Sequence, residues 1–292
     1  MSPAGEADRV GRPAGKGRRL VWTAEAIVGV VVLLGFGLAA AGAPWVAPRD
    51  PLKQNIERRL LPPVWYDRGE FSHALGTDPL GRDILSRIVV GGRISLGVGL
   101  VGACLGAIVG VGLGVVAGYF GGRVDALVMR VADVQLAFPF ILLAIALVAA
   151  LGPSLVNVVL VLGLTSWVRF ARVVRADALA LREGESVAAI VALGAGHTRV
   201  IARHVLPNIM SPIVVVATLE IPRMILMEAA LSFLGLGIQP PAASWGSMVS
   251  DGRKYLEIAW WVATCPGLAI MLVVLSVNLL GDWIRDSLDV RL

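Results

Sequence analysis

The sequence predicts an all-α integral membrane protein with six transmembrane helices. Hydrophobic residues make up 57% of its 292 residues, charged residues only 16%, and the mean hydropathy is +0.78. This composition lies outside the range of soluble globular proteins and indicates several bilayer spans. Crossing the hydrocarbon core takes about 20 apolar residues, and six stretches approach that length. We place them at residues 21–43, 94–118, 134–151, 154–174, 209–236 and 258–280.

The distribution of Lys and Arg orients these spans, because basic residues in short flanking segments are retained in the cytoplasm. The N-terminal tail and the connection after the fourth span are rich in arginine, whereas the short turn at Gly152-Pro153 carries no basic residue. The arginines assigned to that connection are Arg169, Arg172, Arg175, Arg182, Arg199 and Arg203. Residues 44–93 also carry eight basic residues, but long segments cross largely regardless of charge. We therefore expect both termini in the cytoplasm.

The two ends of the chain are expected to be cytoplasmic tails. Residues 1–20 are poor in apolar side chains and rich in Gly, Pro and Arg, which predicts a disordered basic tail, and residues 283–292 form the C-terminal tail. The span at 21–43 has an alternative interpretation, because the small-residue site Ala41-Gly42-Ala43 after an apolar run also describes a cleavable signal peptide. Its apolar run is longer than a usual signal core, which favours a retained anchor.

The net charge of +5 does not indicate nucleic acid, because the basic residues cluster beside the spans. Anionic lipid headgroups explain this clustering better. The lipid bilayer is therefore an expected partner, and nucleic acid is not.

The connection at residues 44–93 is expected outside the membrane, with a helix along the outer surface. The string Gly76-Thr77-Asp78-Pro79 is typical of a turn. The residues that follow have helical periodicity. The apolar side of this interfacial helix would consist of Leu80, Ile84 and Ile88, and the opposite side of Arg82 and Ser86.

The second span contains a ladder of glycines spaced four residues apart. Its members are Gly102, Gly106, Gly110, Gly114 and Gly118, with Gly122 continuing the ladder past the end of the span. Glycine costs about 1 kcal/mol per helix position relative to alanine, so a stripe of glycines indicates a close packing surface for another helix. A surface on which helices slide past one another is the alternative.

Residues 182–208 form a charged, helix-forming connection between two apolar spans. Val187, Ile190 and Val191 recur at helical spacing and predict a first short amphipathic helix. Gly194 and Gly196 then interrupt it.

A second short helix is expected after these glycines. Its apolar face would consist of Val200, Ile201 and Val205. We expect Pro207 to end it, because proline has no backbone N–H to donate. The predicted motif is helix, glycine turn, helix, and it is suited to be a socket for a partner protein.

This motif resembles the cytoplasmic coupling loop of bacterial ATP-binding-cassette importer permeases, in which a glycine and a Leu-Pro pair stand at a fixed separation. In this sequence they are Gly194 and Leu206-Pro207. In that family the loop fits a groove on the ATPase subunit and transmits its closure to the membrane helices. The Glu-Ala-Ala triplet usual in the family is replaced by Ala188-Ala189-Ile190. The coupling residues that the resemblance implies are Glu183, Glu185, Ala189, Gly194, Leu206 and Pro207.

Further strings resemble the dipeptide, oligopeptide and nickel branch of these permeases. They are Gly76-Thr77-Asp78-Pro79-Leu80-Gly81-Arg82-Asp83, Tyr119-Phe120-Gly121-Gly122, residues 231–237, Pro240-Pro241, Ser244-Trp245-Gly246 and residues 278–282. The resemblance runs from about His73 to the C-terminus and implies the type I importer fold, with the permease core at residues 94–282.

The fifth span carries several charges at depth: Glu220, Arg223 and Glu228. Charged groups are costly in lipid, so they should face protein or water. Glu220 and Arg223 are three residues apart and able to pair, whereas Glu228 lies on a different side of the helix. All three are candidates for the translocation path, and internally paired structural groups are the alternative.

The resemblance implies a membrane subunit of an ATP-driven importer in the bacterial inner membrane, working by alternating access and not itself an enzyme. It further implies a second homologous permease subunit, two ATPase subunits and an external solute-binding protein. No cofactor is expected in this chain, and ATP with Mg would be bound by the ATPases. Peptides fit the branch best as substrates, with nickel complexes and oligosaccharides as alternatives.

Two other function classes are weighed against the importer. An ion-coupled secondary transporter would use Glu220, Arg223 and Glu228 as its relay, but it leaves the loop at residues 182–208 unexplained. A membrane enzyme is less well supported, because His73, His197 and His204 are scattered over both faces of the membrane under this topology.

Overall fold

The computed structural model describes residues 22–289, and within that range the predicted all-α architecture is confirmed. Four helices are long and apolar enough to cross a bilayer. They are α1 (Ala24–Ala41), α3 (Ile84–Phe120), α6 (Leu155–Glu183) and α12 (Trp261–Asp289). The predicted tail at residues 1–20 lies outside the described residues, and the predicted C-terminal tail is helical as far as Asp289.

Two further spans are bent. Helices α4 (Gly122–Leu136) and α5 (Phe140–Leu151) meet at 88°, and the short helices at 197–208 meet α10 (Met210–Phe233) at 59°. The total agrees with six spans if each bent pair is one span. The prediction of a continuous third span at 134–151 is wrong, because Pro139 has an extended ψ of 124° and separates the two helices.

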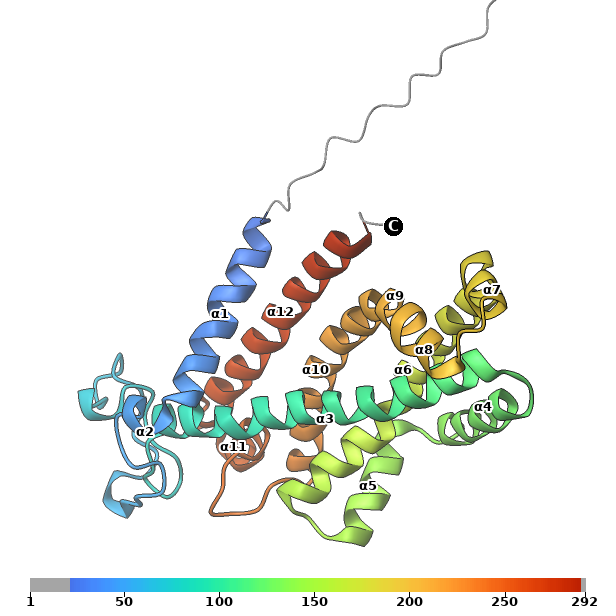
Figure 1. Cartoon of the computed structure of the whole chain (residues 1–292). Helices are drawn as coiled ribbons and strands as arrows, with labels where there is room; N and C mark the ends of the chain where they lie inside the picture. Colours follow the sequence, from blue (N-terminus) through green and yellow to red (C-terminus); the bar gives the residue numbers. More distant parts are fainter. Residues whose placement is uncertain (1–21, 290–292) are drawn as a thin grey trace, which may run out of the picture.

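The predicted packing role of the glycine ladder is confirmed. Helices α3 and α6 lie side by side (Figure 1), and α3 presents Gly106, Gly110, Gly114 and Gly118 to α6. A Cβ on Gly102 would instead meet Met224 of α10. A Cβ on Gly114 would stand 2.7 Å from the carbonyl oxygen of Ala171, and one on Gly118 would stand 2.5 Å from that of Arg175. Such distances leave no room for a side chain, so the glycines set the separation of these helices.

Gly122 is not part of this ladder, contrary to the prediction. A Cβ there would meet nothing within 4 Å. Gly121 and Gly122 have φ of 66° and 56°, in the left-handed region, and they turn the chain from α3 into α4. The periodic spacing continues through Gly122, but the helix does not.

The outer segment also differs from its prediction. Asp83 caps α3, accepting a hydrogen bond from the Ser86 backbone N–H at 2.8 Å. Residues from Ile84 onward are therefore the start of α3 rather than a separate interfacial helix. Leu80 precedes the helix, and Ser86 is buried instead of facing water. The rest of the connection contains only the short helices α2 (Ala43–Val46), η1 (Ile56–Arg58) and η2 (Phe71–His73).

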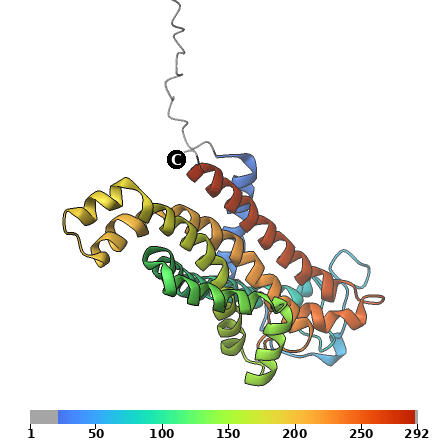
Figure 2. The ribbon, with the colours of Figure 1, turned by 90° about the vertical axis from the view of Figure 1, so that its right-hand side faces the viewer.

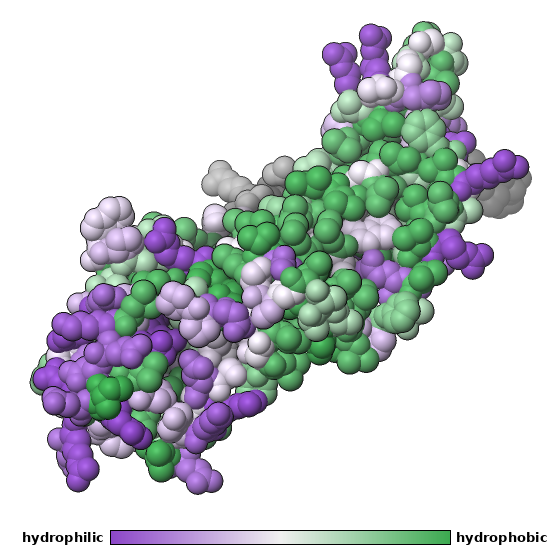
Figure 3. Space-filling view, turned by 90° about the horizontal axis from the view of Figure 1, so that it is seen from below, coloured by the Kyte–Doolittle hydropathy of each residue, from purple (hydrophilic) through white to green (hydrophobic). Residues whose placement is uncertain are grey.

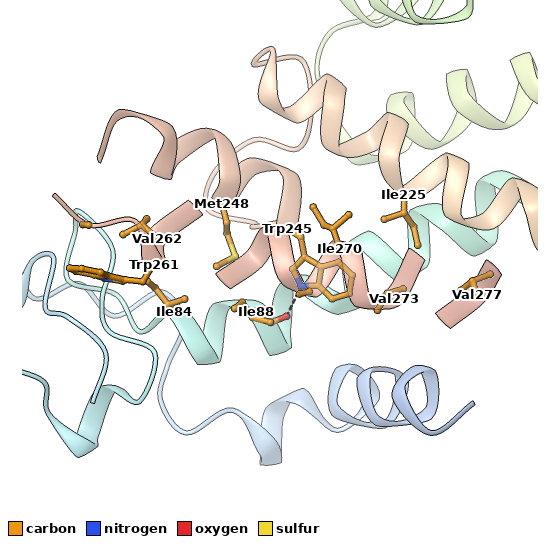
Figure 4. Close-up of a cluster of buried hydrophobic side chains, with 12 residues drawn as sticks. Ile84, Ile88, Ile225, Trp245, Met248, Trp261, Val262, Ile270, Val273 and Val277 are labelled. Carbon is orange, nitrogen blue, oxygen red and sulfur yellow. Dashed lines mark hydrogen bonds between the residues drawn. The ribbon is translucent and has the colours of Figure 1, made fainter. Parts of the chain in front are cut away.

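A second packing unit joins α1, α12 and the start of α3 through α11 (Trp245–Gly252). Trp245 is fully buried among isoleucines and valines from α3, α10 and α12 (Figure 4). Its indole N–H donates to the carbonyl oxygen of Ile88 at 2.8 Å, and its backbone N–H donates to Ser95 Oγ at 3.1 Å. The segment expected as an outer loop before the last span thus includes a helix that packs into the core; η4 (Arg253–Tyr255) follows it.

Polarity divides the surface by region. Apolar side chains cover the middle of the face seen in Figure 3, and polar side chains gather at the end formed by the connection between α1 and α3. The start of α1 and the end of α12 lie together at another end, where Trp22 and Trp283 stack with ring centroids 4.4 Å apart. This arrangement suits a chain that enters and leaves the bilayer on one side. The assignment of that side to the cytoplasm stays a prediction.

Candidate coupling loop and charged clusters

The coupling loop, residues 182–208, has the predicted helix, glycine turn, helix motif. Helix α7 (Glu185–Ala192) is followed by α8 (His197–Val200), η3 (Ile201–Val205) and α9 (Leu206–Asn208). Between α7 and α8, Gly194 has φ of 86°, a conformation that favours glycine. The loop projects from the end of the molecule in both ribbon views (Figures 1 and 2).

One face of the loop is buried against the membrane helices. Val187, Val200 and Val205 are each less than 5% exposed and pack with Val174 and Ala178 of α6. Val191 is 43% exposed, so its predicted place on the apolar face is wrong.

Pro207 does not end the second helix, as was expected. It lies in the first turn of α9, where a missing N–H removes no helical hydrogen bond, and helical structure continues to Asn208. The π-helical turn η3 precedes it. The chain turns into α10 at Ile209.

The opposite face of the loop is open. The six residues predicted for coupling are all exposed: Glu183, Glu185, Ala189, Gly194, Leu206 and Pro207. Leu193, which the sequence reasoning did not select, is 88% exposed beside the turn. A large apolar side chain at an exposed tip suits a protein contact rather than water.

Two side chains at the end of α3 join the loop to the membrane helices. Tyr119 Oη and His197 Nδ1 lie 3.0 Å apart, and the rings of Phe120 and His197 meet edge to face. Sequence reasoning noted Tyr119 and Phe120 only as part of a branch-specific string. The sequence feature that could have indicated this contact is the pair Tyr119-Phe120 directly before the turn glycines Gly121 and Gly122.

The predicted pairing of Glu220 with Arg223 on α10 is confirmed, with Arg223 Nη1 donating to Glu220 Oε2 at 3.0 Å. A third charge joins them from α6: Arg169 Nη1 lies 3.2 Å from Glu220 Oε1. Arg223 also stacks its guanidinium 4.2 Å over the ring of Phe140. Arg169 was assigned by sequence to the basic connection, but it lies near the middle of α6.

Glu228 lies apart from this cluster, as predicted. It is fully buried and accepts hydrogen bonds from Ser232 Oγ at 2.6 Å and from Ser95 Oγ at 3.5 Å. Ser95 in turn binds the backbone of Trp245. Glu228 therefore connects α10, α3 and α11, and its role in a path stays a prediction.

A cavity of about 750 Å³ opens between the connection that joins α1 to α3 and the residues around α11. Arg82, Arg87 and Asp251 are among its lining residues. Behind them, the buried carboxylate of Asp78 pairs with both arginines, with Arg82 Nε at 2.6 Å. Asp251 Oδ2 lies 3.7 Å from Arg87. These ion pairs join the segment around the start of α3 to α11.

Helical spans around an apolar interior, with an exposed helical loop, define the class as a multi-pass membrane protein. The chain belongs to the family described as binding-protein-dependent transport system inner membrane component, whose model matches residues 110–292. Residues 25–63 match the N-terminal transmembrane domain of oligopeptide transport permease C. The predicted location in the inner membrane is thereby confirmed.

Relatives match nearly the whole chain. The di/tripeptide transport system permease protein DppC of Pseudomonas aeruginosa is 45% identical over 267 residues, which cover 91% of this chain and 88% of that protein. The dipeptide transport system permease proteins DppC of Haemophilus influenzae and Bacillus subtilis are each 40% identical. The match to the Haemophilus influenzae protein covers 91% of this chain, and the match to the Bacillus subtilis protein covers 98%. Each match covers 90% of the relative's own length.

The fold is that of a type I importer permease. An inward-facing structure of the MetNI methionine ABC transporter matches with a TM-score of 0.54 and 20% identity, over 69% of this chain and 95% of that one. The predicted fold class is confirmed.

Proposed function

We propose that this chain is the permease subunit of an ATP-driven importer that moves short peptides across the inner membrane by alternating access. The observation that carries the proposal is the coupling loop, which is buried on α3 and α6 through one face and exposed through the other. The names of relatives 40–45% identical over nearly the whole chain support a peptide as the solute.

The loop is built to transmit movement. An ATPase that grips the exposed face, around Leu193 and Gly194, shifts α7 and α8 together. The buried valines and the Tyr119–His197 contact carry that shift to α3 and α6. Since the glycine ladder holds α3 closely against α6, the two helices move as one unit.

The assembly that we propose has a second homologous permease, two ATPase subunits and an external solute-binding protein. ATP and Mg²⁺ are bound by the ATPases, and this chain contributes no catalytic residue. Glu183, Glu185, Ala189, Gly194, Leu206 and Pro207 form its ATPase contact. Glu220, Arg223 and Glu228 belong to the translocation path.

Substituting the turn glycine tests the coupling role. Gly194→Pro should abolish dipeptide uptake while membrane insertion stays normal, because φ of 86° is closed to proline. Gly196→Pro is the matched control, since Gly196 has φ of −67°, which proline adopts. Full uptake by the Gly194→Pro variant would overturn the coupling assignment.

Isolation of the complex tests the partners. The tagged chain, expressed with its genomic neighbours and purified in mild detergent, should bring down ATPase subunits and a second permease in stoichiometric amounts. Scrambling residues 194–207 should remove the ATPases and leave the second permease. Recovery of the chain alone would contradict the importer assignment.

A further inference from the structure

The cluster of Arg169, Glu220 and Arg223 is unbalanced in charge. Two guanidinium groups share one carboxylate, which is only 2% exposed and has one oxygen on each arginine. The next two arginines along α6, Arg172 and Arg175, have acids of their own on α4. Arg172 pairs with Asp133 at 2.6 Å, and Arg175 pairs with Asp125.

The exposed side of this cluster cannot face lipid. Arg169 is 57% exposed and lies near the middle of α6, with its partner Glu220 near the middle of α10. A guanidinium within an apolar span is disfavoured in hydrocarbon, and such groups face protein or a water-filled path. The face of the chain around Arg169 therefore borders the interior of the assembled transporter.

The geometry points to a carboxylate-binding site. We propose that Arg169, backed by Arg223, binds the C-terminal carboxylate of the peptide during its passage; this rests on the proposed function. Glu220 holds one edge of each guanidinium and the ring of Phe140 supports Arg223, so both forks are pre-positioned. The exposed edge of Arg169 remains for a bidentate pair with a carboxylate.

The main-chain carboxylate is the one anion that all unblocked linear peptides share. A site that binds this carboxylate therefore accepts peptides as a class and does not discriminate between their side chains. The net charge of +1 in the cluster also disfavours solutes that carry only positive charge at this point. Without Glu220 the net charge of the cluster would be +2. Glu220 lowers it to +1, which limits how tightly the peptide carboxylate is held.

The test uses the complete transporter in proteoliposomes, with the binding protein omitted so that its own selectivity does not contribute. Binding of dialanine and of dialanine amide to the complex is measured by equilibrium dialysis. The wild type should bind the free acid roughly tenfold or more tightly than the amide, because a charge-assisted bidentate pair is lost with the amide. Arg169→Gln should abolish that preference and leave amide binding unchanged. Arg172→Gln, whose side chain has its own partner Asp133, is the matched control and should keep the preference.

Two further results separate the explanations. If the Arg169→Gln variant does not insert into the membrane, Arg169→Lys is used instead. Lysine keeps the charge but cannot form the bidentate pair, so the preference for dialanine over its amide should fall. An unchanged preference in Arg169→Lys would overturn the site. Loss of the second permease from the Arg169→Gln complex would also overturn it, since an acid of that subunit would then be the partner. Failure of the wild type to take up dialanine when the binding protein is restored contradicts the proposed function itself, whereas normal uptake with no preference for the acid contradicts only this site.

Discussion

The phenol oxygen of Tyr119 lies 3.0 Å from Nδ1 of His197, which joins the penultimate residue of α3 to the first residue of α8. The two rings also meet edge to face, with centroids 5.7 Å apart. The longest helix of the described chain thus ends directly on the coupling loop. Its other end is capped by Asp83, close to the ion pairs of Asp78.

Removal of the Tyr119 hydroxyl should weaken the link between ATP hydrolysis and transport. A net hydrogen bond is worth about 0.5–1.5 kcal/mol, so Tyr119→Phe should lower the peptide moved per ATP hydrolysed roughly two- to tenfold. Both rates are measured in proteoliposomes. Tyr66→Phe is the control, since it removes the hydroxyl that accepts from Trp260 Nε1 in the outer segment. An unchanged ratio in Tyr119→Phe would show that the valine contacts are sufficient.

The glycine ladder predicts a sharp contrast between neighbouring positions on α3. In Gly110→Ala the new methyl group would stand 2.6 Å from Cβ of Phe170, so we expect a loss of about 1–3 kcal/mol in the free energy of unfolding. Gly112→Ala meets nothing within 4 Å and should be neutral or gain up to about 1 kcal/mol. Unfolding in detergent, followed by circular dichroism, checks both. Equal stabilities would contradict the packing role of the ladder.

The outer ion pairs predict a large effect of one buried carboxylate. Asp78 is 1% exposed and pairs with Arg82 and Arg87, so Asp78→Ala leaves two guanidinium groups with only the more distant Asp251. Loss of one partner of a buried pair costs about 3–5 kcal/mol. The same unfolding measurement applies, with the exposed Asp67→Ala in the outer segment as control. Matching stabilities for the two variants would show that Asp251 compensates.

The predicted orientation is tested by a reporter fused after Leu292. An enzyme that is active only in the cytoplasm should be active there, because six spans and a cytoplasmic N-terminus place both ends on one side. A second reporter inserted at Gly69 in the outer connection should be inactive. The opposite pattern would reverse the topology and place the coupling loop outside.

Local chemistry and periodicity predicted the helix, glycine turn, helix motif of the loop and the close packing of the ladder, but not the exposure of Val191, the helical position of Pro207 or the turn at Gly122. Gly194 adopts the conformation that made glycine necessary, and the four-residue spacing of the ladder matches its contacts with α6. Glu220 and Arg223 pair because their separation is fixed within one helix. These features depend on neighbours along the chain, which a sequence displays directly.

Features that depend on two distant segments were missed. Arg169 meets Glu220 across 51 residues of sequence, and its charge alone assigned it to the wrong region. A hydropathy window also averages over the break at Pro139, so the predicted span at 134–151 joins the end of α4 to α5. Helix α11 is only eight residues long and is held by the burial of Trp245, which no periodic pattern reports.

The pairing of α1 with α12 has a consequence for biogenesis. Helix α1 packs mainly against α12, close enough that a Cβ on Gly29 would stand 2.9 Å from the carbonyl oxygen of Ser276. Since ribosomes make the chain from its N-terminus, α1 can first pack only against α3, and some 220 residues separate the end of α1 from the start of its main neighbour α12. Closure of the bundle is therefore a late event, and a chain that stalls before residue 261 leaves the face of α1 that carries Gly29 without its partner α12.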